Sequence, residues 1–432
     1  MRLEMATYTV RDVQLGGPTR LSNGTLHVDS DELRRLVLEG GDFADCAVDV
    51  VRPGDEVRLI HVMDAVEPRY KPGDVSAFPG FLGLPRTAGE GRTHRLGGMA
   101  VVSVGEAVAG EPTYWREAVI DMAGPGASAS ALSGTFNLVL DLQPAAAYLD
   151  SSSPEAELKN IMIGSPLAQR YNHAVRLAQF KAAAYLGSVT ADLPPDEVRI
   201  YDTAIVDPTL PRVVYFLQVN GCALYGGSME SILPSLMSPT EILDGALLNI
   251  RTNSYASVRQ STYFNQNHAV VDELCARHGR DLSFVGVIIY PGAADDIAKK
   301  ELMAEWAVKQ ARLVGADGAC SSYAGGGHPC VEYMLICQKC EQAGIPTVQV
   351  MPETYGTPAD PGFVYFVPEA VSIVSTGRST HRLELPAMPR VIGGREFFDL
   401  PDAPGDRMTI SYRYLLGSCT PTGHGRLTAR AY

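Results

Sequence analysis

The chain has 432 residues, of which 46% are hydrophobic and 20% charged, so it can bury a sizeable core and is neither disordered nor a small disulfide-stapled domain. Its 49 acidic residues exceed the 36 basic ones, and the net charge of -13 argues against a nucleic acid or an anionic membrane as the main partner. It has no run near the roughly 20 apolar residues of a membrane helix and no signal-peptide pattern at its start, so we expect a soluble, cytoplasmic protein.

Residues 1–150 are predicted to form a β-rich domain. Turn signals such as Pro53-Gly54 separate short apolar runs, a pattern typical of strands. The one helix predicted here covers 31–39, with Ser30 as its N-cap. The clearest strand segments are 57–62, 100–104 and 138–142.

Residues 155–432 are predicted to form an α/β domain around a doubly wound, mainly parallel sheet. The domain opens with a long helix over 165–186, where apolar residues recur at helical spacing. Further along, buried strands alternate with helices, which is the order of a parallel sheet with crossover helices. The predicted strands are 213–220, 284–290, 318–322, 347–351 and 370–375, and the predicted helices are 238–246, 269–278, 295–314 and 330–343.

The segment 247–268 breaks this pattern, because it is polar and dense in Asn, Ser, Thr and Gln. Long polar segments inside a compact domain are more often functional than idle. Within it, Ser254 follows Asn253, and a serine hydroxyl can attack the preceding carbonyl in an N-to-O acyl shift. Elimination then leaves dehydroalanine, and hydrolysis with loss of ammonia finally gives a pyruvoyl group, an electrophilic ketone that captures amines. The residue pair alone does not select this position, since Asn-Ser pairs are common in loops.

A glycine-rich loop over 322–330 follows a predicted strand and opens a helix. Ligands bind beyond the carboxyl ends of strands in open α/β sheets, and helix N-termini favour anions. Gly326, Gly327 and His328 are therefore candidates for substrate binding. A helix start can also lower the pKa of a thiol, which makes Cys330 a candidate nucleophile. The alternative is a plain turn with a buried cysteine.

His94, in the turn-rich segment 89–94, is a further candidate acid, base or substrate ligand, although a lone histidine more commonly holds loops together. The 8 cysteines are spread along the chain, which predicts mostly unpaired thiols. Cys337 and Cys340 have CxxC spacing but fall deep inside a predicted helix, so we expect a structural role for them. The histidine spacing suggests no metal site.

Several segments, in order and over nearly the whole chain, resemble the α/β proprotein of component B of glycine, sarcosine and betaine reductases. No single segment is specific for this family, but the whole set in this order is. The segments are Met1-Arg2-Leu3-Glu4, Arg52-Pro53-Gly54, Glu67-Pro68-Arg69, Phe78-Pro79-Gly80-Phe81, 89–94, 120–126, Pro239-Thr240-Glu241, Asp244-Gly245-Ala246, Arg277-His278-Gly279, 284–289, 385–389 and Ile392-Gly393.

The resemblance implies a substrate-activating subunit for glycine or an N-substituted relative. In that family the proprotein is cut before a cysteine that becomes a pyruvoyl group. Its carbonyl captures the substrate amine, and a thiol or selenol of partner subunits cleaves the carbon–nitrogen bond reductively. A hetero-oligomer with such a partner is therefore expected, with no nucleic acid and no membrane involved.

This chain departs from the family where the processed cysteine is expected, between Asp244-Gly245-Ala246 and Thr262-Tyr263, because no cysteine lies there. By position the counterpart is Ser254, with Asn253 before it. Serine is chemically competent, although its hydroxyl is a poorer nucleophile than a thiolate. Two alternatives stay open: an unprocessed enzyme with altered chemistry near Cys330, and a non-catalytic binding or scaffold subunit.

Overall fold

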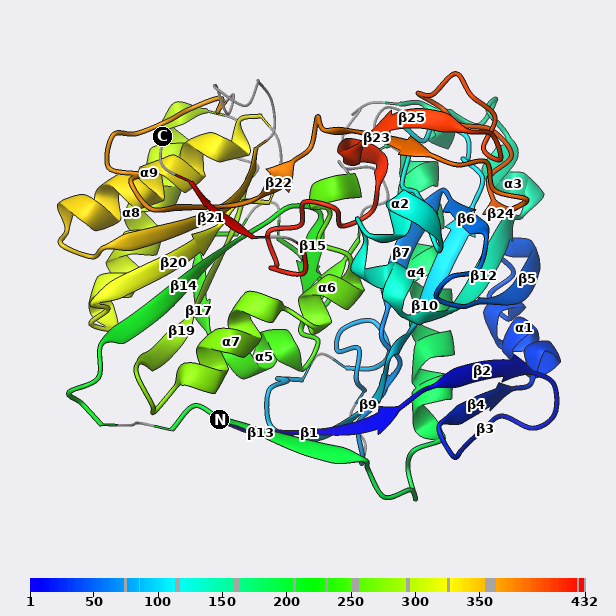
Figure 1. The fold of residues 1–432 in the computed structure, drawn as a ribbon, viewed down its shortest axis with the longest axis horizontal. Coiled ribbons are helices and arrows are strands. Elements are labelled where there is room, and N and C mark those ends of the chain that lie inside the picture. Colours follow the sequence, from blue (N-terminus) through cyan, green and yellow to red (C-terminus); the bar gives the residue numbers. More distant parts are fainter. Residues whose placement is uncertain are drawn as a thin grey trace.

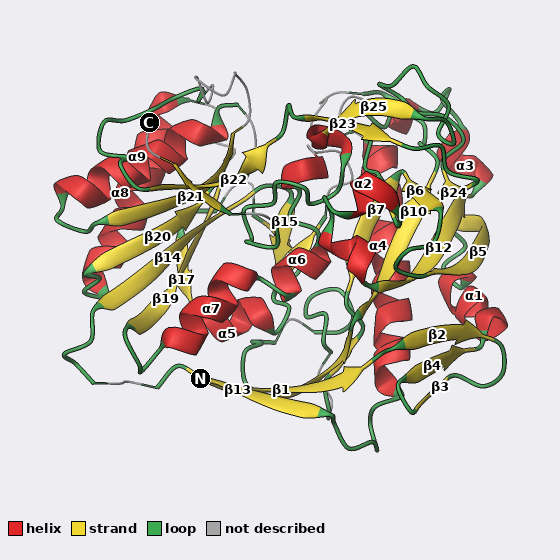
Figure 2. Ribbon diagram, viewed as in Figure 1, coloured by secondary structure: helices red, strands yellow, loops and turns green. Residues whose placement is uncertain are grey.

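The computed structural model describes residues 1–73, 76–84, 86–112, 117–158, 164–204, 207–229, 232–250, 256–292, 296–324, 327–353, 363–425 and 427–430. It confirms the predicted α/β class. A large, mainly parallel sheet occupies one side of the molecule and smaller mixed sheets the other (Figures 1 and 2). Over these ranges no helix combines the length and apolar character needed to cross a membrane.

The N-terminal region is rich in strands, as predicted. One sheet has the order β5-β12-β10-β7, and a second has the order β13-β1-β9-β8. Their strands are β5 (Phe43–Val51), β12 (Phe136–Pro144), β10 (Met99–Gly105), β7 (Val62–Val66), β13 (Glu197–Asp202), β1 (Arg2–Thr9), β9 (Gly91–Gly97) and β8 (Arg69–Tyr70). Smaller sheets contain β11 (Ile120–Asp121), β6 (Val57–Ile60), β24 (Arg390–Gly393), β2 (Asp12–Leu15), β4 (Thr25–Val28), β3 (Arg20–Ser22), β23 (Arg382–Leu385) and β25 (Met408–Ser411).

The predicted helix near residue 31 is α1 (Ser30–Leu38). Its N-cap is Asp29 and not Ser30, because the Asp29 carboxylate accepts the Glu32 N–H at 2.9 Å. An ionised carboxylate also complements the positive end of the helix dipole. Two four-residue helices that the sequence did not predict, α2 (Gly124–Ala127) and α3 (Ala146–Leu149), lie in the same region.

The largest sheet in the described ranges has the order β17-β19-β14-β20-β21-β22-β26. The strands from β19 to β22 are parallel to one another, and β17 and β26 pair antiparallel at the two edges. Helices cover both faces, so the doubly wound arrangement is confirmed. The strands are β17 (Ser235–Met237), β19 (Ser283–Pro291), β14 (Arg212–Val219), β20 (Gly318–Ser322), β21 (Thr347–Glu353), β22 (Ile373–Arg378) and β26 (Thr428–Arg430). The helices are α5 (Pro239–Leu243), α7 (Ala269–Arg277), α8 (Ile297–Leu313) and α9 (Pro329–Gln342).

Between the two sides lie α6 (Thr262–Gln266) and the small sheet of β16 (Gly227–Ser228), β15 (Cys222–Leu224) and β18 (Leu247–Asn249) (Figure 1). The long helix α4 (Pro166–Ser188) begins after its N-cap Ser165 and packs its apolar face into the N-terminal core. Later segments also return to this side, since β13 pairs with β1 and β24 pairs with β6. The division into domains 1–150 and 155–432 stays a prediction.

Candidate functional site

A buried polar segment lies between the two sides of the molecule. It comprises β18, the 3₁₀ turn η3 (Ala256–Val258) and α6, which together form much of the predicted polar segment 247–268. Gln260 is 2% exposed, and Thr262 and Asn265 are fully buried. Burying polar groups costs free energy unless they are bonded, so their concentration here marks a candidate site. Asn253 and Ser254, the predicted catalytic pair, lie outside the described residues.

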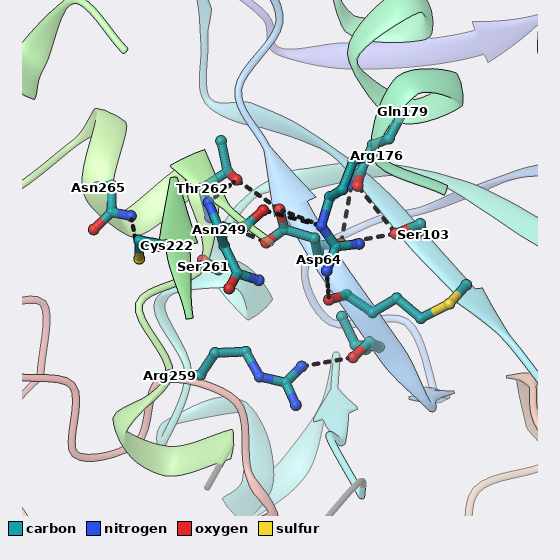
Figure 3. Close-up of polar contacts among 12 residues, drawn as sticks. Asp64, Ser103, Arg176, Gln179, Cys222, Asn249, Arg259, Ser261, Thr262 and Asn265 are labelled. Carbon is teal, nitrogen blue, oxygen red and sulfur yellow. Dashed lines mark hydrogen bonds and ion pairs between the residues drawn. The ribbon is translucent and has the colours of Figure 1, made fainter. Parts of the chain in front are cut away.

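Thr262 ties together the two flanks of residues 251–255 (Figure 3). Its hydroxyl accepts the Asn249 N–H at 3.0 Å and donates to Asp64 Oδ2 at 2.6 Å. Its own N–H donates to Asp64 Oδ1 at 3.0 Å. Asn249 ends β18 and Thr262 begins α6. These three residues, called the Asp64 clasp below, fix the start and the end of the segment in which processing is predicted.

A buried arginine supports the clasp. Arg176 of α4 is 1% exposed, its Nε lies 3.8 Å from Asp64 Oδ2, and it donates to the carbonyl oxygens of Asn249 and Met63 at 3.0 and 3.2 Å. Burial raises the pKa of the Asp64 carboxyl, an effect that Arg176 and Thr262 oppose. Burial likewise lowers the pKa of Arg176, opposed by Asp64. Arg176 Nη1 has no hydrogen-bond partner in the described part of the chain.

Gln218, near the carboxyl end of β14, joins the polar segment to the glycine-rich loop. Its side chain accepts the Ala324 N–H at 3.2 Å and donates to the Pro329 carbonyl at 2.8 Å. Its main-chain carbonyl accepts from Gln260 Nε2 at 3.0 Å. The structure therefore brings together two places that the sequence singled out, at the carboxyl edge of the parallel sheet where ligands bind in such folds.

A neutral histidine lies at the same edge. His268, the N-cap of α7, is fully buried, and its Nε2 lies 3.3 Å from the Tyr215 hydroxyl, which donates to Ser322 Oγ at 2.6 Å. Burial, with a smaller contribution from His424, lowers the pKa of His268 to about 3. The imidazole is therefore uncharged at neutral pH and acts through hydrogen bonds.

The glycine-rich loop follows β20 and opens α9, as predicted. Gly327 has φ +81°, a conformation that favours glycine, and His328 is the N-cap of α9, with its carbonyl accepting from Lys300 Nζ at 3.3 Å. Gly326 lies outside the described residues. Cys330 is 2% exposed, and burial raises the pKa of its thiol to about 12. The expected lowering of this pKa is wrong, because desolvation outweighs the helix start.

His94 lies apart from this cluster. Its ring packs between Tyr8 and Tyr70, with centroids 5.0 and 5.6 Å away, and its Nδ1 is 3.0 Å from Thr190 Oγ1. Burial, helped by Arg92, lowers the pKa of His94. None of these three contacts reaches the polar segment, and the role of His94 in substrate binding stays a prediction.

The 8 cysteines, all within the described ranges, form no disulfide bonds with one another. Cys337 and Cys340 are buried within α9. Burial raises the pKa of Cys337 to about 11 and raises that of Cys340 as well. These thiols stay protonated at neutral pH, in keeping with a structural role for the pair.

The segments behind the family resemblance meet around the candidate site. Asp244 accepts the hydroxyl of Thr93 at 2.5 Å and the N–H of Gly89 at 2.6 Å, and pairs with Lys71. Arg69 donates to the carbonyl of Gln266, the last residue of α6, at 2.9 Å. These contacts fix both ends of the stretch from α5 to α6.

A second group of these segments meets at a buried ion pair. Arg58 donates to both Asp121 oxygens at 2.6 and 2.9 Å and to the carbonyls of Pro386 and Pro404 at 3.1 and 2.6 Å. Asp121 therefore holds distant segments together.

Sequence reasoning missed Asp64, Arg176, Thr262 and Gln218 as site residues. Asp64 interrupts an apolar strand, and Arg176 occupies the apolar face of a long helix. Charged residues at such positions are almost never fully buried unless paired, which is a signal that the sequence carried.

Comparison with known proteins now adds to this geometry. A family model described as glycine/sarcosine/betaine reductase component B subunits matches residues 1–403. The α and β subunits of glycine reductase complex component B from Peptoclostridium acidaminophilum are 32% identical over 455 residues, covering all of both chains. The α subunit of sarcosine reductase complex component B from the same organism is 32% identical over 457 residues, covering all of this chain. The α subunit of betaine reductase complex component B, also from this organism, is 31% identical over 414 residues, covering 92% of this chain and 88% of the relative. No solved structure matches.

Proposed function

Because the chain belongs to the family of glycine/sarcosine/betaine reductase component B subunits, we propose that it activates the substrate of such a reductase through a pyruvoyl group derived from Ser254. The substrate is glycine or an N-substituted relative. A partner subunit with a thiol or selenol supplies the reducing equivalents for cleavage of the carbon–nitrogen bond, so the chain works within a hetero-oligomer.

The observation that carries this proposal is the Asp64 clasp. Asn249 and Thr262 are held together on either side of residues 251–255, and both are buried with Asp64. An internal acyl shift requires a hydroxyl and a carbonyl in fixed proximity. Buried flanks that are fixed to each other support such proximity, whereas the flanks of an ordinary surface loop do not.

The surrounding residues also fit a polar prosthetic group. Three buried polar atoms, Arg176 Nη1, Ser257 Oγ and Asn265 Oδ1, have no hydrogen-bond partner in the described ranges. Buried polar atoms are nearly always partnered, so these are the atoms we expect to contact the ketone and its substrate. A pyruvoyl ketone supplies an electrophile for an amine, and Arg176 supplies a guanidinium for the carboxylate that glycine and its relatives share.

The test is intact mass under denaturing conditions. Purified protein should give fragments 1–253 and 254–432, and the second should react with a hydrazine through its new carbonyl. Ser254→Ala should give one uncut chain, whereas Ser254→Cys, which introduces the family's residue type, should again be cut.

An uncut wild-type chain in a preparation that turns over substrate with its partners would overturn the pyruvoyl proposal and leave the alternative with chemistry near Cys330. An uncut chain that binds the partners but never supports turnover would favour the scaffold alternative.

A further inference from the structure

A separate cavity of about 150 Å³ lies where α6 and α7 meet the sheet of β13, β1 and β9. Its polar lining includes Arg95 from β9, Arg199 and Tyr201 from β13, Asn267 just after α6, and Asp272 from α7. The Arg199 and Asp272 side chains are 38% and 34% exposed, so the cavity opens to solvent along that edge.

The charges in this cavity are unequal. Arg199 Nη1 donates to Asp272 Oδ2 at 2.8 Å, so these two charges pair. Arg95 instead donates to two neutral oxygens, Thr7 Oγ1 at 2.9 Å and Asn267 Oδ1 at 3.2 Å. Across the described residues it forms no ion pair with a carboxylate. The cavity therefore holds two guanidinium groups against one carboxylate, within a chain whose net charge is -13.

We propose that this cavity binds a small carboxylate, with Arg95 as its main contact. A planar guanidinium with free N–H groups matches the two oxygens of a carboxylate. For a free amino acid, Asp272 would face the ammonium group, so the cavity suits a small zwitterion as well as a simple carboxylate. The size of the cavity restricts the ligand to a molecule of a few heavy atoms.

This site adjoins the buried polar segment at the end of α6 and does not require processing at Ser254. The two are linked through α6, because Gln266 and Asn267 line the cavity at the end of the helix whose first residue, Thr262, belongs to the Asp64 clasp. A ligand that contacts Asn267 would therefore stabilise helix α6 and, through its first residue, the Asp64 clasp.

The experiment is calorimetric titration of the full-length Ser254→Ala chain, which lacks a pyruvoyl group, with glycine, acetate and methylamine as probes. Glycine and acetate should bind and raise the melting temperature, whereas methylamine should not. Arg95→Gln should weaken binding about tenfold to a hundredfold, since a hydrogen bond to a charged group is lost. Arg92→Gln is the matched control, because Arg92 lies on the same strand but pairs with Glu4 at 2.9 Å.

A second variant tests the inference independently, in case Arg95→Gln misfolds. Ala269→Leu enlarges a side chain that lines the cavity without removing a charge, and it should also abolish binding while the unliganded melting temperature stays near that of the parent. Absence of glycine and acetate binding, or equal binding by Arg95→Gln and Arg92→Gln, would overturn the inference. Neither result would bear on cleavage at Ser254, which mass analysis of the wild-type chain decides separately.

Discussion

Asp64 places a carboxyl group at a position where strand β7 is otherwise apolar and buried. Two hydrogen bonds from Thr262 and the ion pair with Arg176 offset the cost of desolvating its carboxylate. Asp64→Asn keeps the shape but leaves Arg176 buried without its counter-ion, and breaking one partner of a buried pair costs about 3–5 kcal/mol. We expect denaturant unfolding in the Ser254→Ala background to show a loss of this size.

The matched control is Asp45→Asn, which removes a carboxylate from the exposed pair with Arg34 at 2.7 Å. Exposed pairs contribute little because water and salt screen them, so this variant should unfold almost like its parent. If Asp64→Asn lost as little unfolding free energy as Asp45→Asn, the pairing of the Asp64 carboxylate would contribute nothing to stability.

Cys330 is predicted from its burial to be inert. Its thiol is 2% exposed, its pKa is raised to about 12, and its Sγ lies 3.3 Å from the Tyr365 carbonyl. Since the thiolate is the reactive form, iodoacetamide should label Cys330 in the native protein at neutral pH far more slowly than in the unfolded chain. Peptide mass mapping measures this directly. Rapid native labelling would restore Cys330 as a candidate nucleophile.

The Thr262 hydroxyl makes two hydrogen bonds at the start of helix α6, and a substitution of this side chain isolates their loss. Thr262→Val keeps the volume but removes the hydroxyl that joins Asn249 to Asp64, so Asn249 and Asp64 each lose a buried partner. Thr262→Ser keeps the hydroxyl. On the proposed function, the valine variant should slow cleavage before Ser254 at least tenfold, and the serine variant should be cut almost normally. Identical cleavage time courses by denaturing electrophoresis would contradict a role for the clasp.

The start of α7 makes stability depend on pH. The pKa of His268 is lowered from 6.5 to about 3, so between these values the unfolded chain takes up a proton that the folded chain does not. The contribution of His268 to the free energy of unfolding is therefore fully present above pH 6.5. It falls as the pH is lowered, by up to about 1.4 kcal/mol per pH unit. His268→Asn retains an N-cap residue and should give a shallower decline of unfolding free energy between pH 6.5 and about pH 5. An unchanged slope would mean that His268 is not desolvated.

At the scale of the whole molecule, cleavage before Ser254 would leave two interleaved fragments. Strand β14 of fragment 1–253 lies between β19 and β20 of fragment 254–432, and β6 of the first fragment pairs with β24 of the second. Arg58 adds hydrogen bonds to the carbonyls of Pro386 and Pro404 across the division. Separating the fragments would expose the centre of the large sheet, so a cut chain should remain one folded body.

Size-exclusion chromatography checks this expectation. The cut protein should elute at the same volume as uncut Ser254→Ala, and the fragments should separate only in denaturant. Fragment 254–432 expressed alone should be insoluble or unfolded, because its sheet lacks β14, the strand that joins β19 to β20. Elution of two native species would contradict the interleaved arrangement.

The sequence by itself determined the α/β class, the long helix α4 and the alternation of strands and helices along the second half of the chain, because local periodicity and turn residues decide these features. It also located the polar segment and the glycine-rich loop, since both break the surrounding pattern. It did not determine the N-cap of α1, where Asp29 and Ser30 are both suitable residues.

Only the tertiary structure decided which polar groups meet. Asp64, Arg176 and Thr262 are far apart in the sequence, and their pairing depends on how α4, β7 and α6 pack. The tertiary structure also decided the protonation state of Cys330. The position of this residue at a helix start predicts a reactive thiol, but its burial raises the pKa of that thiol, and no local sequence pattern reports burial. Contacts and desolvation arise between distant segments, and for that reason the chemistry of this site follows from the folded chain and not from its motifs alone.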